Sequence, residues 1–206
     1  MIIGSGDIPK LLSGLKTKGY RELWKKFIDD TPVYYNALAS PIDALRTGAI
    51  LENNYLQTLS EDYFTQVKCT FDEMNVFVCS LDFAKYSGGV VSEFEELKTI
   101  FLPDFIDIIK PLSKESEKQQ VKVLKSKFKN NYNQIQDQLM CAELDEARLV
   151  FLSVDSYDDE INKQRVIEEN DVVKFRITRD DETINFIKQR GKIFQQVKDH
   201  FNEFSK

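Results

Sequence analysis

The sequence predicts one α+β domain over residues 1–206, with a central mixed β-sheet that contains an antiparallel meander and is flanked by helices. The main observation is a change of period along the chain. Apolar residues recur at helical spacing before residue 60, and they alternate as in strands between Tyr63 and Ile100. A chain of 206 residues that is 42% hydrophobic is also large enough to bury a core without disulfides.

Helices are expected before the meander. The pattern predicts a helix over residues 7–29 with a break at Gly19, followed by a loop at residues 31–32. Ser40 has the features of an N-cap, because a proline follows it and an acidic residue comes three positions later. We therefore expect the next helix to run from Ser40 to about Leu59.

The meander is expected to have three strands. They cover residues 64–71, 75–83 and 90–100, and the pair Gly88-Gly89 suits the turn between the second strand and the third. Because side chains alternate along a strand, this hairpin decides which residues of the two strands face each other.

A basic segment opens the second half of the chain. Residues 110–129 carry seven Lys and two Glu, a local net charge of +5 in a protein whose overall charge is −6. The helix that follows is expected to have an apolar seam from Val121 to Leu139. Its lysines at spacings of four, three and four share a second face: Lys118, Lys122, Lys125 and Lys129. Strands at 147–154 and 172–178 and a helix at 181–204 complete the prediction.

The composition argues against several chemistries. The only histidine, His200, lies in the expected closing helix, so a Ser-His-Asp or Cys-His hydrolase is not expected. The three dispersed cysteines, Cys69, Cys79 and Cys141, predict neither a zinc site nor a disulfide framework. The sequence also lacks the glycine-rich motifs that hold nucleotide phosphates. Carboxylates and lysines remain, and carboxylate oxygens favour a hard cation such as Mg²⁺.

No membrane segment or export signal is expected. The longest apolar runs, such as Leu149–Leu152, are far shorter than the roughly 20 residues needed to cross a bilayer. Residues 1–7 lack the basic start and the long apolar stretch of a signal peptide. The sequence therefore predicts a cytoplasmic protein.

The sharpest candidate site lies in the meander. A hairpin about the glycine pair brings Asp82 opposite residue 95 or 96, and Glu96 and Lys98 share one face of the third strand. Two carboxylates placed side by side repel unless a cation neutralises them, which a divalent metal would do. The Leu97 carbonyl is a candidate third oxygen ligand. Lys98 would then lie beside a metal-bound water, whose hydroxide form suits phosphodiester hydrolysis.

Each of these features also has a plainer interpretation. An Asp and a Glu-x-Lys on neighbouring strands fit a solvated, salt-bridged sheet face, and short motifs often mislead. Gly48, one turn before Glu52, would let a strand or a substrate approach that carboxylate, but helices often carry such pairs. The lysine face fits a solvated surface, and Gln134 and Gln136 fit ordinary surface amides. The order and the joint occurrence of the features favour the functional interpretation.

The order of these features resembles a known nuclease pattern. Four segments, read along the chain, resemble the successive motifs of the PD-(D/E)xK nucleases: Gly48-x-x-x-Glu52, Ser80-Leu81-Asp82, Glu96-Leu97-Lys98 and Gln134-Ile135-Gln136. The version with Gln-x-Gln and a downstream strand is similar to the lambda-type exonucleases, also called YqaJ-like viral recombinases. The similarity includes residues 4–14, 132–140 and 172–180, and so spans nearly the whole chain. It implies a restriction-endonuclease-like core.

The resemblance implies a metal-dependent DNA exonuclease and assigns roles to individual residues. Asp82, Glu96 and the Leu97 carbonyl would hold Mg²⁺ or Mn²⁺, and Lys98 would orient or activate the attacking water. Glu52 would bind a second metal or its water.

Contacts to DNA are implied for a second set of residues. Gln134 would help to hold the active-site end of the DNA, with Gln136 close by. Ser5 is the candidate contact in the opening segment, and Lys118, Lys122, Lys125 and Lys129 form the best local basic lining. An acidic protein is compatible with this, since DNA contact needs only a locally basic surface.

The family also suggests partners. Its members digest duplex DNA from a 5′ end, leave a 3′ single strand, form rings around the duplex and work with a single-strand annealing protein. The resemblance therefore implies double-stranded DNA as the substrate and a homo-oligomeric ring, with a trimer favoured. It further implies a possible annealing partner in phage recombination, and the host cytoplasm as the location if the protein is phage-encoded.

The opening segment departs from the family pattern. Gly6 stands where the family usually has a Ser that helps to bind the 5′ phosphate, and Ser5 lies one residue earlier. The Arg that commonly lies upstream of that Ser has no counterpart in the sequence before Gly6. Hydrolysis is therefore a firmer expectation than dependence on a 5′ phosphate.

Two alternative functions stay open. The first is a structure-specific or restriction-like endonuclease on the same fold, which would cut closed circular DNA. The second is a catalytically idle module that binds DNA or a partner protein. The intact set of Asp82, Glu96 and Lys98 argues against the second alternative.

Overall fold

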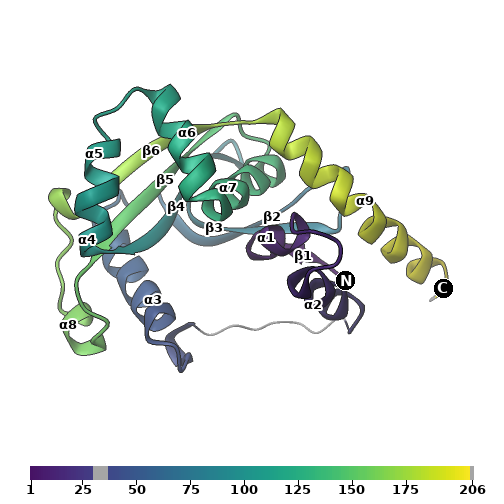
Figure 1. Cartoon of the computed structure of the whole chain (residues 1–206), viewed down its shortest axis with the longest axis horizontal. Helices are drawn as coiled ribbons and strands as arrows, with labels where there is room; N and C mark the ends of the chain where they lie inside the picture. Colours follow the sequence, from purple (N-terminus) through teal and green to yellow (C-terminus); the bar gives the residue numbers. More distant parts are fainter. Residues whose placement is uncertain (30–36, 205–206) are drawn as a thin grey trace.

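A mixed sheet with helices on both faces forms the centre of the molecule (Figure 1). The computed structural model describes residues 1–29 and 37–204, and the loop expected at residues 31–32 lies outside them. The expected class, an α+β fold with an antiparallel meander in a mixed sheet, is confirmed. None of the described helices is long and apolar enough to cross a membrane.

The described part of the sheet has six strands. They are β1 (Ile3–Gly4), β2 (Phe64–Thr70), β3 (Phe77–Ser87), β4 (Val90–Phe101), β5 (Glu146–Val154) and β6 (Val172–Thr178). Their order is β1-β3-β4-β5-β6, and β2 pairs with β3. The meander β2-β3-β4 is antiparallel, as expected, while β1 with β3 and β4 with β5 are parallel pairs.

The turn of the hairpin follows the prediction. Ser87 pairs with Val90, so the loop consists of Gly88 and Gly89 alone. Their φ angles are 61° and 86°, the left-handed values that a type I′ turn requires at both positions. This turn sets the first pairs of β3 with β4, and a β-bulge between Lys85 and Tyr86 then shifts the register, so that Phe83 pairs with Glu95.

One edge of β3 is left partly open. β2 pairs along one edge, from Phe64↔Ala84 to Thr70↔Val78. The other edge pairs with β4 from Phe83 onward and with the short β1 at Phe77 and Val78. Within the described residues, positions 79–82 therefore have no strand partner on that edge, and a gap separates β1 from β4.

The described helices and short helical turns alternate with these strands. They are η1 (Ser5–Asp7), α1 (Ile8–Leu11), α2 (Lys18–Asp29), η2 (Ala37–Ala39), α3 (Asp43–Leu56), α4 (Leu102–Asp104), η3 (Phe105–Ile109), α5 (Lys110–Leu112), α6 (Glu117–Lys127), α7 (Lys129–Ala142), α8 (Asp159–Lys163), η4 (Glu169–Asp171) and α9 (Asp181–Phe204). Neither β1, nor the segment from α4 to α5, nor α8 was expected from the sequence.

The two N-terminal helices differ from the expectation in their bounds. The first helical region breaks between Leu11 and Lys18 and not at Gly19. The second helix begins at Asp43, because the Ser40 hydroxyl accepts the Ile42 N–H at 3.2 Å across a short turn and does not cap the helix. Local cap signals placed the start of this helix too early.

The long basic helix is in fact two helices. Phe128 separates α6 from α7 with φ −116° and ψ 37°, outside the helical region. Its ring packs on Phe151 of β5, with ring centroids 5.0 Å apart. Packing on the sheet thus overrides the helical period of the sequence.

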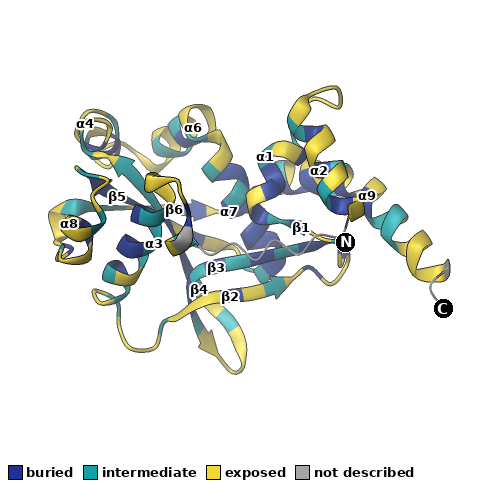
Figure 2. Ribbon diagram, turned by 90° about the horizontal axis from the view of Figure 1, so that it is seen from below, coloured by how far each residue is buried: buried dark blue, intermediate teal, exposed yellow. Residues whose placement is uncertain are grey.

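The core has two parts, one on each face of the sheet (Figure 2). The larger part packs α7, α9 and the N-terminal elements, and the smaller one packs α3 on β3, β4 and β5. Gly191 brings α9 close to the sheet, since a Cβ atom there would overlap the Phe77 ring. Phe194 is buried, whereas Phe201 is exposed, because the end of α9 extends beyond the body of the molecule.

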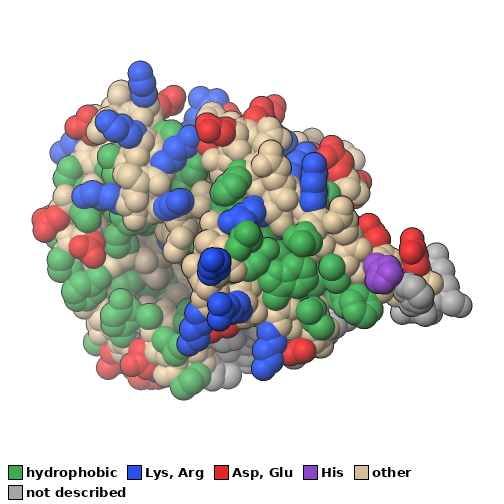
Figure 3. Space-filling model, turned by 45° about the vertical axis from the view of Figure 1, so that its right-hand side comes forward, with side chains coloured by type: hydrophobic (Ala, Val, Ile, Leu, Met, Phe, Trp, Pro, Cys, Tyr) green, Lys and Arg blue, Asp and Glu red, His purple; other side chains and the backbone are tan. Residues whose placement is uncertain are grey.

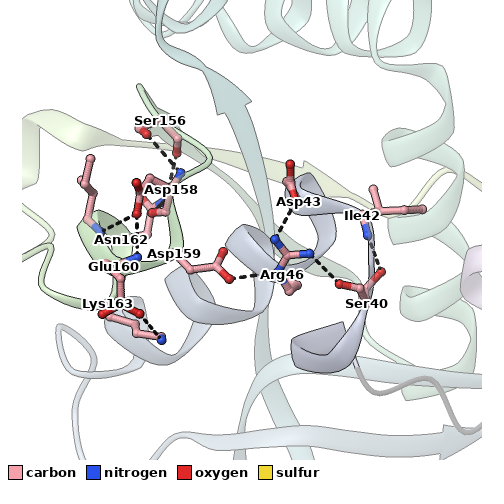
Figure 4. A network of polar contacts seen from close by, with 11 residues as sticks. Ser40, Ile42, Asp43, Arg46, Ser156, Asp158, Asp159, Glu160, Asn162 and Lys163 are labelled. Atoms are coloured by element: carbon pink, nitrogen blue, oxygen red, sulfur yellow. Dashed lines mark hydrogen bonds and ion pairs between the residues drawn. The ribbon is translucent and has the colours of Figure 1, made fainter.

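Helix α3 is clamped onto α8 and its loop (Figure 4). Arg46 donates to Asp159 at 2.9 Å and to the Ser40 carbonyl at 2.7 Å. Further along the helix, the Asn54 amide donates to the carbonyls of Asn162 and Arg165 at 2.7 and 3.0 Å. The connection between β5 and β6 thus holds the helix that carries Glu52.

Candidate active site

Asp82 and Glu96 lie where β3 and β4 separate. The ladder between these strands ends, away from the turn, with the pair Phe83↔Glu95, whose neighbours are Asp82 and Glu96. Beyond it the Asp82 carboxylate replaces a strand partner, since its Oδ2 accepts the Leu97 N–H at 2.9 Å. The carbonyl of a strand residue points to the same side as its N–H, so the Leu97 carbonyl also faces β3. The structure therefore brings Asp82, Glu96 and Leu97 together.

Glu96 is the centre of the hydrogen bonds at this point. It is 1% exposed, and its Oε1 accepts from Lys98 Nζ at 2.5 Å and from the Gln134 amide at 2.6 Å. Its Oε2 accepts from the Gln138 amide at 2.6 Å. The same amide donates to the Ser80 carbonyl at 3.0 Å, on the open edge of β3. Helix α7 thus fills the gap in the sheet with two amide side chains.

Gln138 was not identified from the sequence. The available signal was its position four residues after Gln134, which places both side chains on one face of a helix. Gln136, the residue chosen instead, points to the opposite side of α7 and is fully buried. Its amide donates to the Thr178 carbonyl at 2.9 Å, and its Oε1 accepts the Asp180 N–H at 2.7 Å. Gln136 therefore holds the junction of β6 and α9 and is not part of the candidate site.

Glu52 approaches the same carboxylates from α3. Burial, followed by the charge of Glu96, raises the pKa of Glu52, while Lys98 opposes this. Among the described residues, its carboxylate accepts no hydrogen bond. A Cβ atom at Gly48 would meet no atom within 4 Å, so no strand uses the space expected there. The structure brings Glu52 to the site and leaves the space beside Gly48 open.

The electrostatics show a shortage of positive charge. Burial, then Glu96, raises the pKa of Asp82 well above its usual range, and Lys98, the Leu97 N–H and Glu52 act more weakly. Burial lowers the pKa of Lys98, but Glu96 and Asp82 outweigh it and the net shift is upward. In the part of the chain that the structure describes, three carboxylates thus share one ammonium group.

The donor set fits a hard divalent cation. Carboxylates whose mutual repulsion raises their pKa gain from a cation, and Mg²⁺ and Mn²⁺ take carboxylate and carbonyl oxygens. The described residues hold no preformed cluster of three or more His, Cys, Asp or Glu side chains around a common point. Lys98, Gln134 and Gln138 already occupy the oxygens of Glu96. A cation at Asp82 and Glu96 would therefore compete with Lys98.

Ser5 lies on the same edge of the sheet. Gly4 pairs with Val78 in the parallel ladder of β1 and β3, so the next residues run along the open positions of β3. Ser5 itself is 6% exposed. Asp7, two residues later, accepts the Gly4 N–H at 3.2 Å and forms an ion pair with Lys26. The opening segment thus approaches the gap, with the Ser5 side chain buried.

The lysine face is exposed to solvent. Lys118, Lys122 and Lys129 are exposed and, among the described residues, make no side-chain hydrogen bond or ion pair. Lys125 pairs with Asp180 at 2.7 Å, near Gln136 and on the side of α7 away from Gln134. Figure 3 shows Lys and Arg side chains at the upper left of one face and through its centre, beside a group of apolar side chains.

A second buried carboxylate, Glu95, lies on the other face of β4. It is 1% exposed, and Lys174 contacts both of its oxygens, at 3.0 and 3.1 Å. Arg148 donates to it at 3.2 Å, and the Tyr55 hydroxyl donates to it at 2.5 Å. Sequence reasoning missed this group, because its partners come from strands and a helix far apart in the chain.

Comparisons with known proteins connect this geometry to a fold. No protein-family profile matches the sequence, and no curated protein matches it. Among solved structures, an alkaline exonuclease from Laribacter hongkongensis is similar, with a TM-score of 0.59 and 15% identity over 99% of this chain and 92% of that one. A phage-related exonuclease from Haemophilus somnus 129PT gives a TM-score of 0.54 and 17% identity, over 100% and 97% of the two chains. The expected restriction-endonuclease-like core is thus confirmed, and this chain has the fold of these exonucleases over nearly its whole length.

Proposed function

We propose that this protein is a divalent-metal-dependent exonuclease that hydrolyses double-stranded DNA. The arrangement of Asp82, Glu96 and Lys98 where β3 and β4 separate is the observation that carries the proposal. The three carboxylates carry more negative charge than the one ammonium group can balance, so a divalent cation would be stabilised there. Phosphodiester hydrolysis uses such a cation.

The chain's own residues suit the separate tasks of the reaction. Asp82, Glu96 and the Leu97 carbonyl would hold Mg²⁺ or Mn²⁺, and Glu52 would hold a second ion or its water. A bound metal would polarise the phosphate and lower the pKa of a coordinated water. Lys98 would orient the attacking water through its ammonium group. Gln134 and Gln138 keep Glu96 in place through hydrogen bonds at both of its oxygens.

The exonuclease mode is supported by the shared fold. Both similar structures are described as exonucleases, and the Laribacter hongkongensis protein has also been solved in complex with dAMP. A mononucleotide is the product class of an exonuclease. We propose digestion in the 5′ to 3′ direction, with a 3′ single strand left for phage recombination. A ring of identical chains and a single-strand annealing partner belong to the same proposal.

Digestion of DNA with different ends tests the proposal. Linear duplex DNA with 5′-phosphate or 5′-hydroxyl ends and a covalently closed circle are incubated with the protein in Mg²⁺ and, separately, in excess EDTA. We expect digestion of the linear DNA in Mg²⁺ alone, release of mononucleotides, and an untouched circle. Lys98→Ala is the matched negative control.

The other outcomes decide between the alternatives. Cutting of the circle would replace the exonuclease with an endonuclease. Absence of any cleavage with Mg²⁺ or Mn²⁺ by a folded protein would leave a module that only binds DNA or a partner. A preference for 5′-phosphate ends would mean that other residues perform the task of the missing Ser and Arg.

A further inference from the structure

We propose that Tyr55 is a positioning residue that sets the place of Glu52 relative to Asp82 and Glu96. This inference rests on the proposed function of the same site and adds a residue to it. Tyr55 acts from the face of the sheet opposite the Glu96 side chain, through contacts with the last residue pair of the β3–β4 ladder.

Tyr55 is a buried contact between α3 and the sheet. It is 1% exposed, and its hydroxyl donates to Glu95 Oε2 at 2.5 Å. Its ring packs edge-on against Phe83, with ring centroids 5.3 Å apart at an angle of 65°. One side chain thus contacts both strands of the meander that carry the candidate site.

Phe83 and Glu95, which Tyr55 contacts, stand beside the two carboxylates in the chain. Phe83 and Glu95 form the ladder pair after which β3 and β4 separate. Asp82 precedes Phe83 in the chain, and Glu96 follows Glu95. Neighbouring side chains of a strand lie on opposite faces of the sheet. Tyr55 therefore contacts Phe83 and Glu95 on one face, and the adjacent residues Asp82 and Glu96 form the site on the other.

The position of Glu52 depends on Tyr55 because both residues belong to α3. It lies three residues before Tyr55 in α3, and residues three apart are neighbours on a helix surface. Movement of Tyr55 along β4 would therefore move the Glu52 carboxylate relative to Glu96. The clamp through Arg46 and Asn54 ties α3 to α8 and its loop, whereas Tyr55 ties it to the strand that carries Glu96.

Charge balance does not require the Tyr55 hydroxyl. Lys174 contacts both oxygens of Glu95, and Arg148 contacts one of them, so the carboxylate keeps two cations without Tyr55. Glu95 is thus held in place by its cations, and the hydrogen bond from the Tyr55 hydroxyl fixes the position of α3 relative to β4. Removing it should affect geometry at Glu52 more than the charge of Glu95.

The test removes one oxygen atom. Tyr55→Phe keeps the ring on Phe83 and loses the bond to Glu95. Tyr63→Phe is the matched control, because the Tyr63 hydroxyl bonds Glu93 and lies 3.5 Å from Glu95 but belongs to no part of α3. Mn²⁺ binding to each purified variant is measured by electron paramagnetic resonance, thermal unfolding checks the fold, and kcat and KM for linear DNA are measured separately.

We expect Tyr55→Phe to stay folded and to bind Mn²⁺ about tenfold more weakly, a factor typical of one charge-assisted hydrogen bond. Its kcat should be lower, and its KM for DNA should be unchanged. Tyr63→Phe should match the unchanged protein in all three measurements. In a Glu52→Gln background, Tyr55→Phe should have no further effect on Mn²⁺ binding, because it acts through Glu52.

Three results would overturn the inference. They are unchanged Mn²⁺ affinity in Tyr55→Phe, an equal loss in Tyr63→Phe, and a full additional loss in the Glu52→Gln background. Failure of the proposed function is distinguishable from these results. A protein that binds Mn²⁺ in a Tyr55-dependent way but cleaves no DNA would refute the nuclease proposal and keep the inference.

Discussion

Glu95 and Glu96 are neighbours on β4, each is 1% exposed, and they differ in the charges around them. Glu95, with Glu93 beside it, faces Arg148 and Lys174, so positive and negative charges balance. Among the described residues, Glu96 faces two further carboxylates and a single cation, Lys98. Burial of a carboxylate is therefore common to both faces, and the missing positive charge distinguishes the candidate site from the structural one.

The largest expected effect comes from removing the lysine that pairs with the buried glutamate on each face of β4. Lys98→Ala should reduce DNA cleavage by about 100-fold or more, as for other electrostatic catalytic groups, and leave DNA binding intact. Lys174→Ala removes the corresponding cation from Glu95 and should lower the melting temperature while cleavage stays within a few-fold. Cleavage rates and thermal unfolding of both variants check this. Normal turnover by Lys98→Ala would refute the site assignment.

Metal should stabilise the protein in a pH-dependent way. The folded pKa values of Asp82 and Glu52 are raised, so the folded state holds protons that the unfolded chain has released. The free energy of unfolding then falls as pH rises from about 4, the unfolded pKa, towards the folded values. Because a cation replaces these protons, Mg²⁺ should raise the melting temperature more at about pH 8 than at about pH 5.

Asp137 provides a control for this pH effect. Burial raises its pKa well above the usual range, and neither of its oxygens has a hydrogen-bond partner among the described residues. Asp137→Asn should reduce the loss of stability at high pH and leave the Mg²⁺ effect unchanged. An equal Mg²⁺ effect at both pH values in the unchanged protein would contradict a metal site at Asp82 and Glu52.

The two glutamines of α7 should separate function from stability at a smaller scale. Gln138→Ala removes a hydrogen bond from Glu96 and should lower cleavage by about tenfold, the value of one bond to a charged group. Gln136→Ala leaves the Thr178 carbonyl and the Asp180 N–H without their partner and should lower stability instead. Cleavage assays and denaturant unfolding of both variants make the comparison. The reverse pattern would show that Gln136 acts at the site.

The smallest effect is expected from the lysine face of α6. If this face touches DNA, removal of one lysine that neutralises a phosphate should reduce the slope of log affinity against log salt by about 0.9. Lys122→Ala removes an exposed ammonium group without an ion pair among the described residues, whereas Lys125→Ala removes one already paired with Asp180. Binding of a catalytically inactive protein to linear DNA is measured at several salt concentrations. Lys122→Ala should reduce the slope more than Lys125→Ala does. An unchanged slope would exclude this face from the DNA interface.

The sequence by itself predicted that Asp82 lies opposite residue 95 or 96 and left the choice between them open. Alternation and the two-residue glycine turn are local properties, but the turn alone would place Asp82 opposite Glu95, and the β-bulge between Lys85 and Tyr86 shifts the register towards Glu96. The position of Lys98 on the same face followed from the same period of two. The order of the motifs then predicted the fold, which the structural comparisons confirm.

Only the tertiary structure decided which helix residues join that pair. Gln134 and Gln136 looked alike in sequence, yet Gln134 and Gln138 contact Glu96 and Gln136 contacts Asp180, because the packing of α7 on the sheet decides which of its faces meets Glu96. Tyr55 meets Glu95 because α3 packs on the far face of β4, a contact between residues 40 positions apart. Hydrogen bonds within a hairpin depend on local register, whereas contacts between a helix and a sheet depend on the packing of the whole core.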